Sequence, residues 1–485
     1  MAVKEKIVSN LSKAVIGNRL LRNIIAKQIE KIAYKRAMER DDDLFSQNVW
    51  RDKINGIKAM YLSVIRNLDR GIVSKRAVGR LIETLVERVF FQDAQEKEAV
   101  ELFKEKYGIG PPLFITLSPT KRCNLNCIGC YASSTSTSAE TLEWSIVDRI
   151  ITELHNEIGM RFFVISGGEP LMYESGGKSI LDLARKWKDS FFLMYTNGTL
   201  ITESKAKEMA ELGNITPAIS LEGFEEETDQ RRGRGVYNII LKAFENLKKA
   251  GVPFGTSVTA TKKNVDTLLS DEFYDFYFEE IGVSYMWIFQ YMPIGRRFTT
   301  ELMISPEQRF ELFKKQREAL SQKHYFVADF WNSAILSSGC ISCARPGGGY
   351  FYIDWNGNIM PCVFIPYYKD NAKRLFAEGK KVIDAIFSDF FIKGREWQSR
   401  YFNQNGKLGN MLRPCFIRDH HRAFLEIAEK CNVLPEDQAA KEAMEDEGYH
   451  KELIKFDEKL KEIEDPYWQK EYAKKQEEVK LDLSL

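Results

Sequence analysis

The spacing of hydrophobic positions changes near residue 108. Before it, apolar residues recur every three to five positions with Lys and Arg between them, as in "IVSNLSKAVIGNRLLRNIIAKQIEKIAYKRAM". That spacing predicts amphipathic helices. "WRDKINGIKAMYLSVIRNLDRG" and "SKRAVGRLIETLVERVFF" repeat the pattern. We expect residues 1–108 to form a helical region that packs on the next domain. A basic face that rests on lipid headgroups is the alternative.

A second pattern begins after "YGIGPP" (107–112), whose Gly and Pro residues end the helical period. From there, short apolar runs alternate with amphipathic stretches such as "VYNIILKAFENLKKAG". The runs are rich in β-branched and aromatic residues, which favours strands. The predicted strands are 113–119, 161–167, 191–197, 216–222, 254–261 and 285–292.

Strands that alternate with helices indicate a parallel sheet covered by helices, an α/β fold. Six such units predict a partial (β/α)6 barrel of the TIM type over residues 109–324. In barrels of this kind the chemistry lies at the carboxyl ends of the strands. Cys123, Cys127 and Cys130 follow the first predicted strand directly, so this loop is a candidate active site.

Two further regions complete the chain. Residues 325–432 hold all five remaining cysteines, Cys340, Cys343, Cys362, Cys415 and Cys431. Residues 433–485 predict a charged helical tail. Within the third region, "YFYIDWNGNIMPC" alternates apolar and polar positions around Asn356-Gly357, which predicts a β-hairpin. The hairpin would bring Cys343 and Cys362 to one end.

Composition narrows the setting. The 485 residues are 44% hydrophobic and 29% charged with a net charge of +1, which excludes a disordered chain. Residues 1–40 are basic and residues 434–485 acidic, so either the basic end meets a membrane or nucleic acid, or the two ends meet each other. We see no secretory signal and no apolar run of transmembrane length. We expect a cytoplasmic protein, with peripheral membrane contact left open, whose clustered cysteines serve metal binding or catalysis.

The spacing of the first three cysteines, "CNLNCIGC", separates two kinds of metal site. Zinc sites take four ligands, often as two close pairs, and the nearest histidine, His155, lies within a predicted helix. A [4Fe–4S] cube has four irons that each accept a thiolate. Three cysteines on one loop would hold three irons and leave the fourth open. This pattern favours a cluster that binds a substrate or cofactor.

C-x3-C-x2-C after the first barrel strand resembles the signature of the radical S-adenosylmethionine (radical SAM) enzymes. The resemblance implies that the open iron of a [4Fe–4S] cluster binds the amino and carboxylate groups of S-adenosylmethionine (SAM). Reductive cleavage of SAM would then give a 5′-deoxyadenosyl radical that abstracts hydrogen from substrate. An electron donor such as a ferredoxin or flavodoxin is implied as partner.

Other stretches resemble the family in the same order. "SGGEP" (166–170) resembles its GGEP motif, "TNGT" (196–199) its turn after the third strand, and "ISLEG" (219–223) its I-S-x-D-G. "DQRRGRG" (229–235) and "YMPIGR" (291–296) follow. Two positions depart from the family: Gly129 stands where an aromatic residue is common, and Glu222 where aspartate is usual. By the resemblance, the cofactor-binding residues are Tyr131, Gly167, Gly168, Glu169, Pro170, Asn197, Ser220, Glu222 and Arg232.

The second cysteine set resembles the auxiliary-cluster region of SPASM and twitch radical SAM enzymes through its C-x13-G-x4-C element. The resemblance implies one auxiliary [4Fe–4S] cluster, fully ligated by Cys340, Cys343, Cys362 and Cys415, in an electron-relay or structural role. A structural zinc with four thiolates is the alternative. Cys431 lies at helical spacing, which predicts that it is a buried free thiol. We expect Arg418 and Asp419 to belong to a polar surface.

The sequence says least about the substrate. We expect an unactivated C–H bond, with a membrane lipid acyl chain and C–C bond formation placed ahead of a peptide or protein side chain. The reason is that residues 1–108 show basic helices and none of the strands of a peptide-recognition module. From another class, a non-catalytic iron–sulfur electron carrier or a zinc-stabilised scaffold stays open. Nucleic acid is not expected, since no basic stripe with interleaved aromatics is present.

Overall fold

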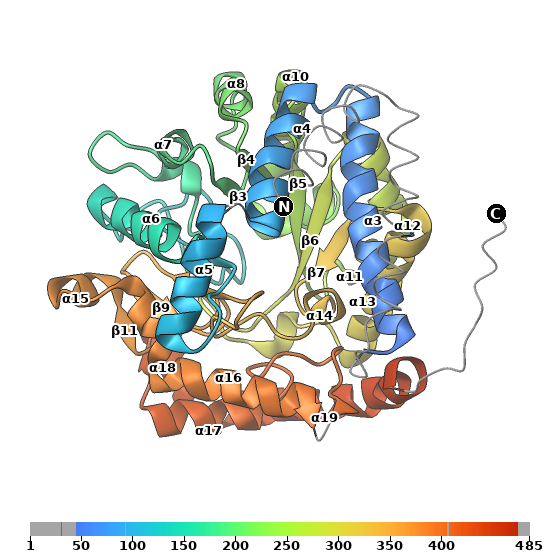
Figure 1. Ribbon diagram of the computed structural model, residues 1–485. Helices are drawn as coiled ribbons and strands as arrows, with labels where there is room; N and C mark the ends of the chain where they lie inside the picture. Colours follow the sequence, from blue (N-terminus) through green and yellow to red (C-terminus); the bar gives the residue numbers. More distant parts are fainter. Residues whose placement is uncertain (1–30, 32–44, 93, 405–406, 474–485) are drawn as a thin grey trace.

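The computed structural model describes residues 31, 45–92, 94–404 and 407–473. These residues form a curved parallel sheet with helices packed around it (Figure 1). The basic stretch 1–40, on which the lipid-surface hypothesis depends, lies almost entirely outside the described residues, as does the end of the chain from 474. In the described part, no helix combines the length and the apolarity needed to cross a membrane.

The barrel strands confirm the predicted α/β class. All six predicted strands are present and pair in parallel in sequence order. A seventh short strand, which the sequence pattern did not predict, pairs in parallel with the sixth. The strands are β1 (Phe114–Leu117), β2 (Phe162–Ile165), β3 (Phe191–Thr196), β4 (Ile215–Leu221), β5 (Gly255–Ala260), β6 (Tyr285–Gln290) and β7 (Val327–Asp329).

Amphipathic helices cover the outer face of this sheet. In α10 (Val236–Ala250), Ile240, Phe244 and Leu247 are fully buried, and Gly251 ends the helix with a φ of 72° that glycine adopts without strain. The other outer helices are α6 (Trp144–Ile158), α7 (Ile180–Lys186), α8 (Glu203–Leu212), α9 (Glu225–Arg232), α11 (Val265–Leu269), α12 (Asp271–Asp275) and α13 (Pro306–Glu318).

The predicted cysteine hairpin is present and continues the barrel sheet. β8 (Tyr350–Ile353) and β9 (Asn358–Met360) pair antiparallel around the turn at Gly357, and β8 pairs in parallel with β1. The two-residue strand β11 (Asp370–Asn371) adds to β9, which gives a ten-stranded sheet in the order β11-β9-β8-β1-β2-β3-β4-β5-β6-β7. Residues from both sides of position 325 therefore share one sheet.

The N-terminal helices that the structure describes, within residues 45–107, pack on the barrel. They meet the loops that precede the strands, at the end of the barrel opposite the cysteines. Asn67 donates to the carbonyl of Gly282 (2.7 Å) just before β6, and the Ser74 amide donates to Gly251 (3.0 Å) before β5. These helices are α3 (Gln47–Asp69), α4 (Lys75–Leu81), the π-helical η1 (Ile82–Phe91) and α5 (Ala94–Tyr107).

The C-terminal helices form a layer along one end of the barrel (Figure 1, orange to red). The last of them returns to the N-terminal helix α3: Trp468 and Tyr472 pack in one apolar cluster with Val49, and the Tyr472 hydroxyl donates to Asp52. In the described part of the chain, the two ends therefore meet. The layer consists of α16 (Asp389–Phe402), α17 (His421–Cys431), α18 (Gln438–Glu445), α19 (Glu447–Trp468) and η7 (Gln469–Ala473).

Candidate active site

The loop after β1 carries the first three cysteines at the carboxyl end of the sheet. Cys123 is buried, and its Sγ accepts hydrogen bonds from the Leu125 amide (3.4 Å) and the Asn197 side chain (3.7 Å). Burial raises the pKa of Cys123 to about 12, and the nearby Cys127 and Cys130 add to that rise. The three thiols are therefore close enough to interact electrostatically, and none is in a disulfide.

The glycines after β2 allow this loop to approach the sheet closely. A Cβ on Gly168 would lie 2.3 Å from the carbonyl oxygen of Arg122, and one on Gly167, whose φ is 125°, would lie 2.5 Å from that of Thr120. The Gly168 amide donates to Thr120 O (2.9 Å), and the Glu169 amide to Arg122 O (2.8 Å). Only glycine can pack against the cysteine loop at this distance.

Glu169 and Asn197 join the loops after β2 and β3. The fully buried Glu169 carboxylate caps the 3₁₀ turn that begins at Pro170 and accepts from Thr196 Oγ1 (2.7 Å) and the Asn197 amide (2.7 Å). The Asn197 side chain then donates to Asn124 in the cysteine loop (2.9 Å). Burial raises the pKa of Glu169. The predicted motif residues of three strands thus form one hydrogen-bonded unit.

Glu222, at the end of β4, binds two arginines of α9. Its Oε1 lies 2.5 Å from Arg231 Nη1 and 2.6 Å from Arg232 Nη2. Its Oε2 and the Nε of Arg232 are buried without a hydrogen-bond partner among the described residues. Ser220, on the same strand, lines the cavity described below and bonds to Ser257 (2.9 Å). This unsatisfied polar pair beside the cysteines fits a polar cofactor.

The structure gives a steric reason for the departure at Gly129. Its φ is 63°, and a Cβ there would lie 2.6 Å from the ring of Tyr291, which follows β6. Tyr131 instead turns its hydroxyl toward Ser166 (3.2 Å) and Gly167 O (3.4 Å). The P-x-G-R turn closes the site: a Cβ on Gly295 would lie 2.2 Å from Tyr131 O. Tyr291, the first residue of the "YMPIGR" stretch, is a site residue that the sequence analysis did not single out.

The second cysteine set gathers from three parts of the chain. Cys340 and Cys343 precede β8, Cys362 follows β9, and Cys415 precedes α17. The four thiols perturb one another electrostatically, because Cys340 and Cys362 each contribute to the raised pKa values of Cys343 and Cys415. Burial is the largest cause of all these rises.

Hydrogen-bond donors surround these four thiols. The Ser342 hydroxyl lies 3.2 Å from Cys340 Sγ, the Tyr350 hydroxyl 2.9 Å from Cys362 Sγ, and the Phe364 amide 3.5 Å from the same sulfur. Cys343 has a φ of 60°, which is unusual for a residue with a side chain and is typical of functional sites. Among the described residues, no three His, Cys, Asp or Glu side chains lie close enough to hold a single metal ion. Cys431 is a buried free thiol, as predicted.

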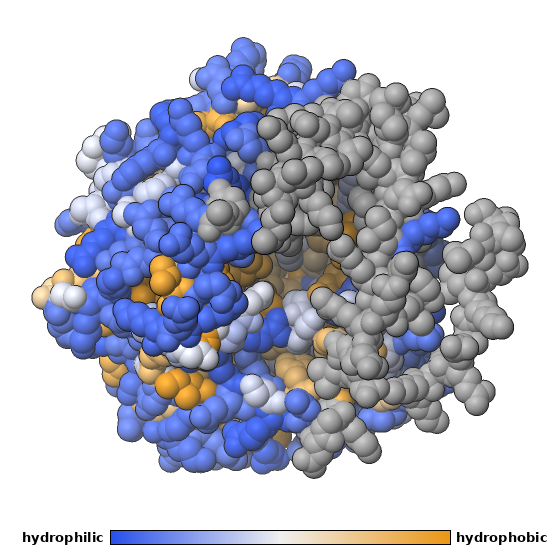
Figure 2. Space-filling model, in the orientation of Figure 1, coloured by the Kyte–Doolittle hydropathy of each residue, from blue (hydrophilic) through white to orange (hydrophobic). Residues whose placement is uncertain are grey.

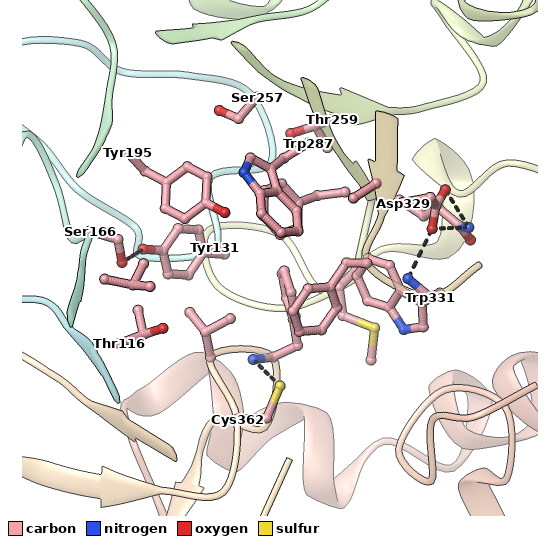
Figure 3. A pocket seen from close by; sticks show the side chains of 18 of the residues that line it. Thr116, Tyr131, Ser166, Tyr195, Ser257, Thr259, Trp287, Asp329, Trp331 and Cys362 are labelled. Carbon is pink, nitrogen blue, oxygen red and sulfur yellow. Dashed lines mark hydrogen bonds between the residues drawn. The ribbon is translucent and has the colours of Figure 1, made fainter. Parts of the chain in front are cut away.

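A cavity of about 490 Å³ inside the barrel connects the two cysteine sets. Cys123, Cys127 and Cys130 line one part of it, and Cys340, Cys362 and Cys415 another. Figure 3 shows Tyr131, Tyr195 and Trp287 together on one side of this space, with Cys362 across from them. Figure 2 shows hydrophobic residues within a hollow on one face of the molecule. Other aromatic lining residues include Phe114, Phe162, Phe289, Phe330, Trp331 and Phe364.

The prediction that Arg418 and Asp419 belong to a polar surface is wrong. Both residues are fully buried. Asp419 accepts two hydrogen bonds from Arg309 (2.5 and 3.1 Å) and one from the Cys415 amide (3.1 Å), because the turn before α17 faces the second cysteine set. The polar residues in "CFIRDHH" (415–421) suggested a surface position. The helix that covers them, α19, comes from residues 447–468, so local sequence did not reveal the burial.

Comparisons with known proteins identify the family. A sequence model of the radical SAM superfamily matches residues 117–269. The chain is 35% identical over 312 residues to the mycofactocin maturase MftC of Mycolicibacterium smegmatis. The matched region covers 62% of this chain and 76% of that protein. The chain belongs to the radical SAM superfamily. Members of this superfamily use a [4Fe–4S] cluster and SAM, so this protein is a radical SAM enzyme.

Two further likenesses show the range of relatives. The AdoMet-dependent heme synthase of Methanosarcina barkeri is 26% identical over 294 residues, 54% of this chain and 80% of that protein. The fold is similar to a crystal structure of Streptococcus suis SuiB bound to precursor peptide SuiA, with a TM-score of 0.52 and 19% identity over 71% of this chain and 79% of that one. The partial barrel is therefore the fold of this radical SAM enzyme.

Proposed function

We propose that Cys123, Cys127 and Cys130 hold the [4Fe–4S] cluster of this radical SAM enzyme and that its open iron binds SAM. Gly167, Gly168, Glu169, Pro170 and Asn197 would shape the cofactor site from the ends of β2 and β3. Tyr131, Ser220, Glu222 and Arg232 would line its other side. The unpartnered Oε2 of Glu222 and Nε of Arg232 support this assignment, because a bound cofactor would satisfy both atoms.

We also propose that Cys340, Cys343, Cys362 and Cys415 hold a second [4Fe–4S] cluster. Four thiolates satisfy all four irons. The hydroxyl and amide donors around the thiols would stabilise their ionised form, which cluster binding requires. The cavity that joins the two sets would place the substrate between the clusters. An external reductant such as a ferredoxin or flavodoxin would supply electrons.

The proposed substrate is an uncharged, apolar or aromatic side chain of a peptide. The observation that carries this choice is the lining of the cavity. Its walls carry many aromatic side chains, and the charged residues in the lining, as far as the chain is described, are Arg231, Arg232 and Asp329. Both arginines are paired with Glu222, and Asp329 accepts from Gln290 and from the amides of residues 331 and 332. The likeness to a maturase at 35% identity supports the same choice.

Two other substrate classes fit less well. An iron tetrapyrrole is the second candidate, because the M. barkeri heme synthase is matched over 80% of its length. A tetrapyrrole with several carboxylates would need several cationic partners, and the two arginines in the described lining already share Glu222. A lipid acyl chain would suit apolar walls, but none of the three similar proteins named above carries the name of a lipid enzyme. The basic residues proposed to meet lipid lie outside the described part.

The chain's own residues would hold the substrate and keep out water. Bound SAM and its cluster supply the radical that takes hydrogen from an unactivated C–H bond. Trp287 on β6 and Tyr195 on β3 lie beside each other on one side of the cavity (Figure 3). Their rings would hold an apolar side chain beside the cofactor and exclude water, which protects a reactive intermediate from side reactions. Ser257 and Thr259 from β5 supply hydroxyls at the same wall.

The test is a comparison of substrates under anaerobic conditions. Enzyme reconstituted with iron and sulfide receives SAM, dithionite and one of three compounds: a peptide encoded beside its gene, an iron tetrapyrrole, or anionic lipid vesicles. Mass spectrometry follows 5′-deoxyadenosine and the mass of each compound. We expect a mass change in the peptide alone, and none with the Cys127→Ala variant. A changed tetrapyrrole or lipid with an unchanged peptide would overturn the proposed substrate and keep the enzyme class.

A further inference from the structure

A buried arginine next to the second cysteine set has no acceptor for its charge. Arg418 is fully buried, and its Nε, Nη1 and Nη2 have no hydrogen-bond partner among the described residues. A guanidinium is always charged at neutral pH and has five N–H donors. A buried charge of this kind without a partner is costly, so proteins pair such groups or bind an ion to them.

Asp419 and Asp329, the two acids that act electrostatically on Arg418, are already used by other groups. Asp419 binds Arg309 through both carboxylate oxygens. Asp329 accepts from the Gln290 amide (3.0 and 3.1 Å) and from the main chain of Trp331 (2.9 Å). Neither forms an ion pair with Arg418 among the described residues. The positive charge of Arg418 is therefore not balanced by the acids around it.

The position of Arg418 is fixed by its contacts. Its guanidinium carbon lies 5.1 Å from the ring centroids of both Trp331 and Phe456, which is cation–π distance. The Arg418 main-chain amide donates to the Cys415 thiol, and the arginine charge interacts with that thiol. Trp331 and Cys415 both line the cavity between the two cysteine sets. Two rings thus hold an uncompensated cation against one of the four proposed cluster ligands.

We propose that Arg418 is the charge partner of the cluster held by Cys340, Cys343, Cys362 and Cys415, and that it raises the reduction potential of that cluster. This inference rests on the second cluster of the proposed function. A cube with four thiolates carries net negative charge, which grows when the cluster takes up an electron. Net charge and hydrogen bonds to sulfur set such potentials. A buried cation stabilises the reduced form, so the cluster accepts an electron more readily.

The experiment uses the full chain with Cys123, Cys127 and Cys130 replaced by Ala, which leaves the second cluster alone. In this background we compare Arg418, Arg418→Lys and Arg418→Gln by iron and sulfide content and by electron paramagnetic resonance during redox titration. We expect Arg418→Gln to lower the midpoint potential by at least the equivalent of a tenfold change in the reduction equilibrium, about 59 mV for one electron. We expect the midpoint potential of Arg418→Lys, which keeps the charge, to lie between those of the Arg418 parent and Arg418→Gln.

Arg422→Gln is the matched control, because Arg422 is an exposed arginine of the same segment that pairs with Glu458 (3.1 Å). It should leave the potential unchanged. The melting temperature of the metal-free protein is a second readout, since removal of an uncompensated charge should not destabilise that form. The proposal is also supported if the Arg418→Gln variant fails to load its cluster while the Arg418→Lys variant, which keeps the charge, loads it.

Equal potentials in all four proteins would overturn the role of Arg418 and leave the second cluster intact. A metal-free Arg418→Gln protein with a clearly lower melting temperature than its parent would likewise assign Arg418 a structural role. Zinc, or no metal, in the background protein would overturn the second cluster itself, and the role of Arg418 with it. The two failures are therefore distinguishable.

Discussion

The two cysteine sets differ in how they are built. The first lies on one loop, with three cysteines in eight positions, and three of the five residues between them, Asn124, Asn126 and Ile128, are exposed. The second draws on positions 340 to 415, and the residues that surround it are buried, among them Ser342, Phe416 and Asp419. Their charges differ as well. Two arginines near the first set share Glu222, whereas Arg418 at the second has no acid of its own.

The difference indicates that the two cysteine sets have separate roles in the reaction. A site on an exposed loop can exchange a diffusible cofactor, and the unsatisfied atoms beside it await a polar molecule. A site enclosed by several elements cannot exchange its contents easily, so its chemistry is fixed by the surrounding protein. We therefore expect changes at the first set to affect SAM cleavage, and changes at the second to affect what happens to the substrate afterwards.

The largest expected effect comes from removal of the first set. The Cys123/Cys127/Cys130→Ala variant should lose all 5′-deoxyadenosine formation, and its iron content should fall from about eight to about four per chain. Iron, sulfide and zinc analysis after anaerobic reconstitution measures this directly. Iron content unchanged by the triple substitution would contradict the assignment of the loop.

The second prediction separates the two sites. Cys415→Ala should also bring the iron content to about four, because the second cube then lacks one of its four thiolate ligands. SAM cleavage without peptide should persist, while conversion of the peptide stops. Cys431→Ala serves as the matched control, since Cys431 is a buried thiol outside both sets. Equal losses of SAM cleavage in the Cys415→Ala and triple variants would contradict the proposal that the first set cleaves SAM and the second acts on substrate conversion.

A third prediction tests the packing of the exposed loop. Gly129→Ala places a Cβ 2.6 Å from Tyr291 at a φ of 63°. We expect a local cost of about 1–2 kcal/mol from the left-handed conformation alone, and faster iron loss to a chelator from the first site. Gly176→Ala has a similar φ of 58° and no atom within 4 Å of the added Cβ, so it isolates the backbone cost. Identical iron loss in both variants would mean that the Tyr291 contact is unimportant.

The smallest expected effect concerns a buried acid in the helical layer over the second set. Burial raises the pKa of Glu464 from 4.5 to about 8. The folded protein therefore holds this proton while the unfolded chain releases it, so stability should fall as the pH rises from about 4.5 to 8, at up to about 1.4 kcal/mol per pH unit. Glu464→Gln should flatten the melting temperature between pH 6 and pH 8. An unchanged pH profile would show that Glu464 is ionised in the folded protein.

The sequence predicted what local patterns encode. Six strands, the hairpin at Gly357 and the buried Cys431 followed from short-range spacing. It did not predict β7, because Val327–Asp329 is too short for an alternating pattern. Nor did it predict the burial of Arg418 and Asp419, which depends on helices distant in sequence. Tyr291 could have been found, since a glycine at an expected aromatic position requires another side chain to fill that space.

The pairing of β8 with β1 has a consequence for synthesis of the chain. These strands lie about 230 residues apart, yet their backbones hydrogen-bond directly. At roughly 5–20 residues per second, the ribosome would need some ten to fifty seconds to make the intervening segment. Throughout that interval the apolar edge of β1 has no neighbour on one side, and an unpaired strand edge of this kind favours aggregation. The strand that precedes the first cysteines thus gains its second neighbour only when the second cysteine set is being made.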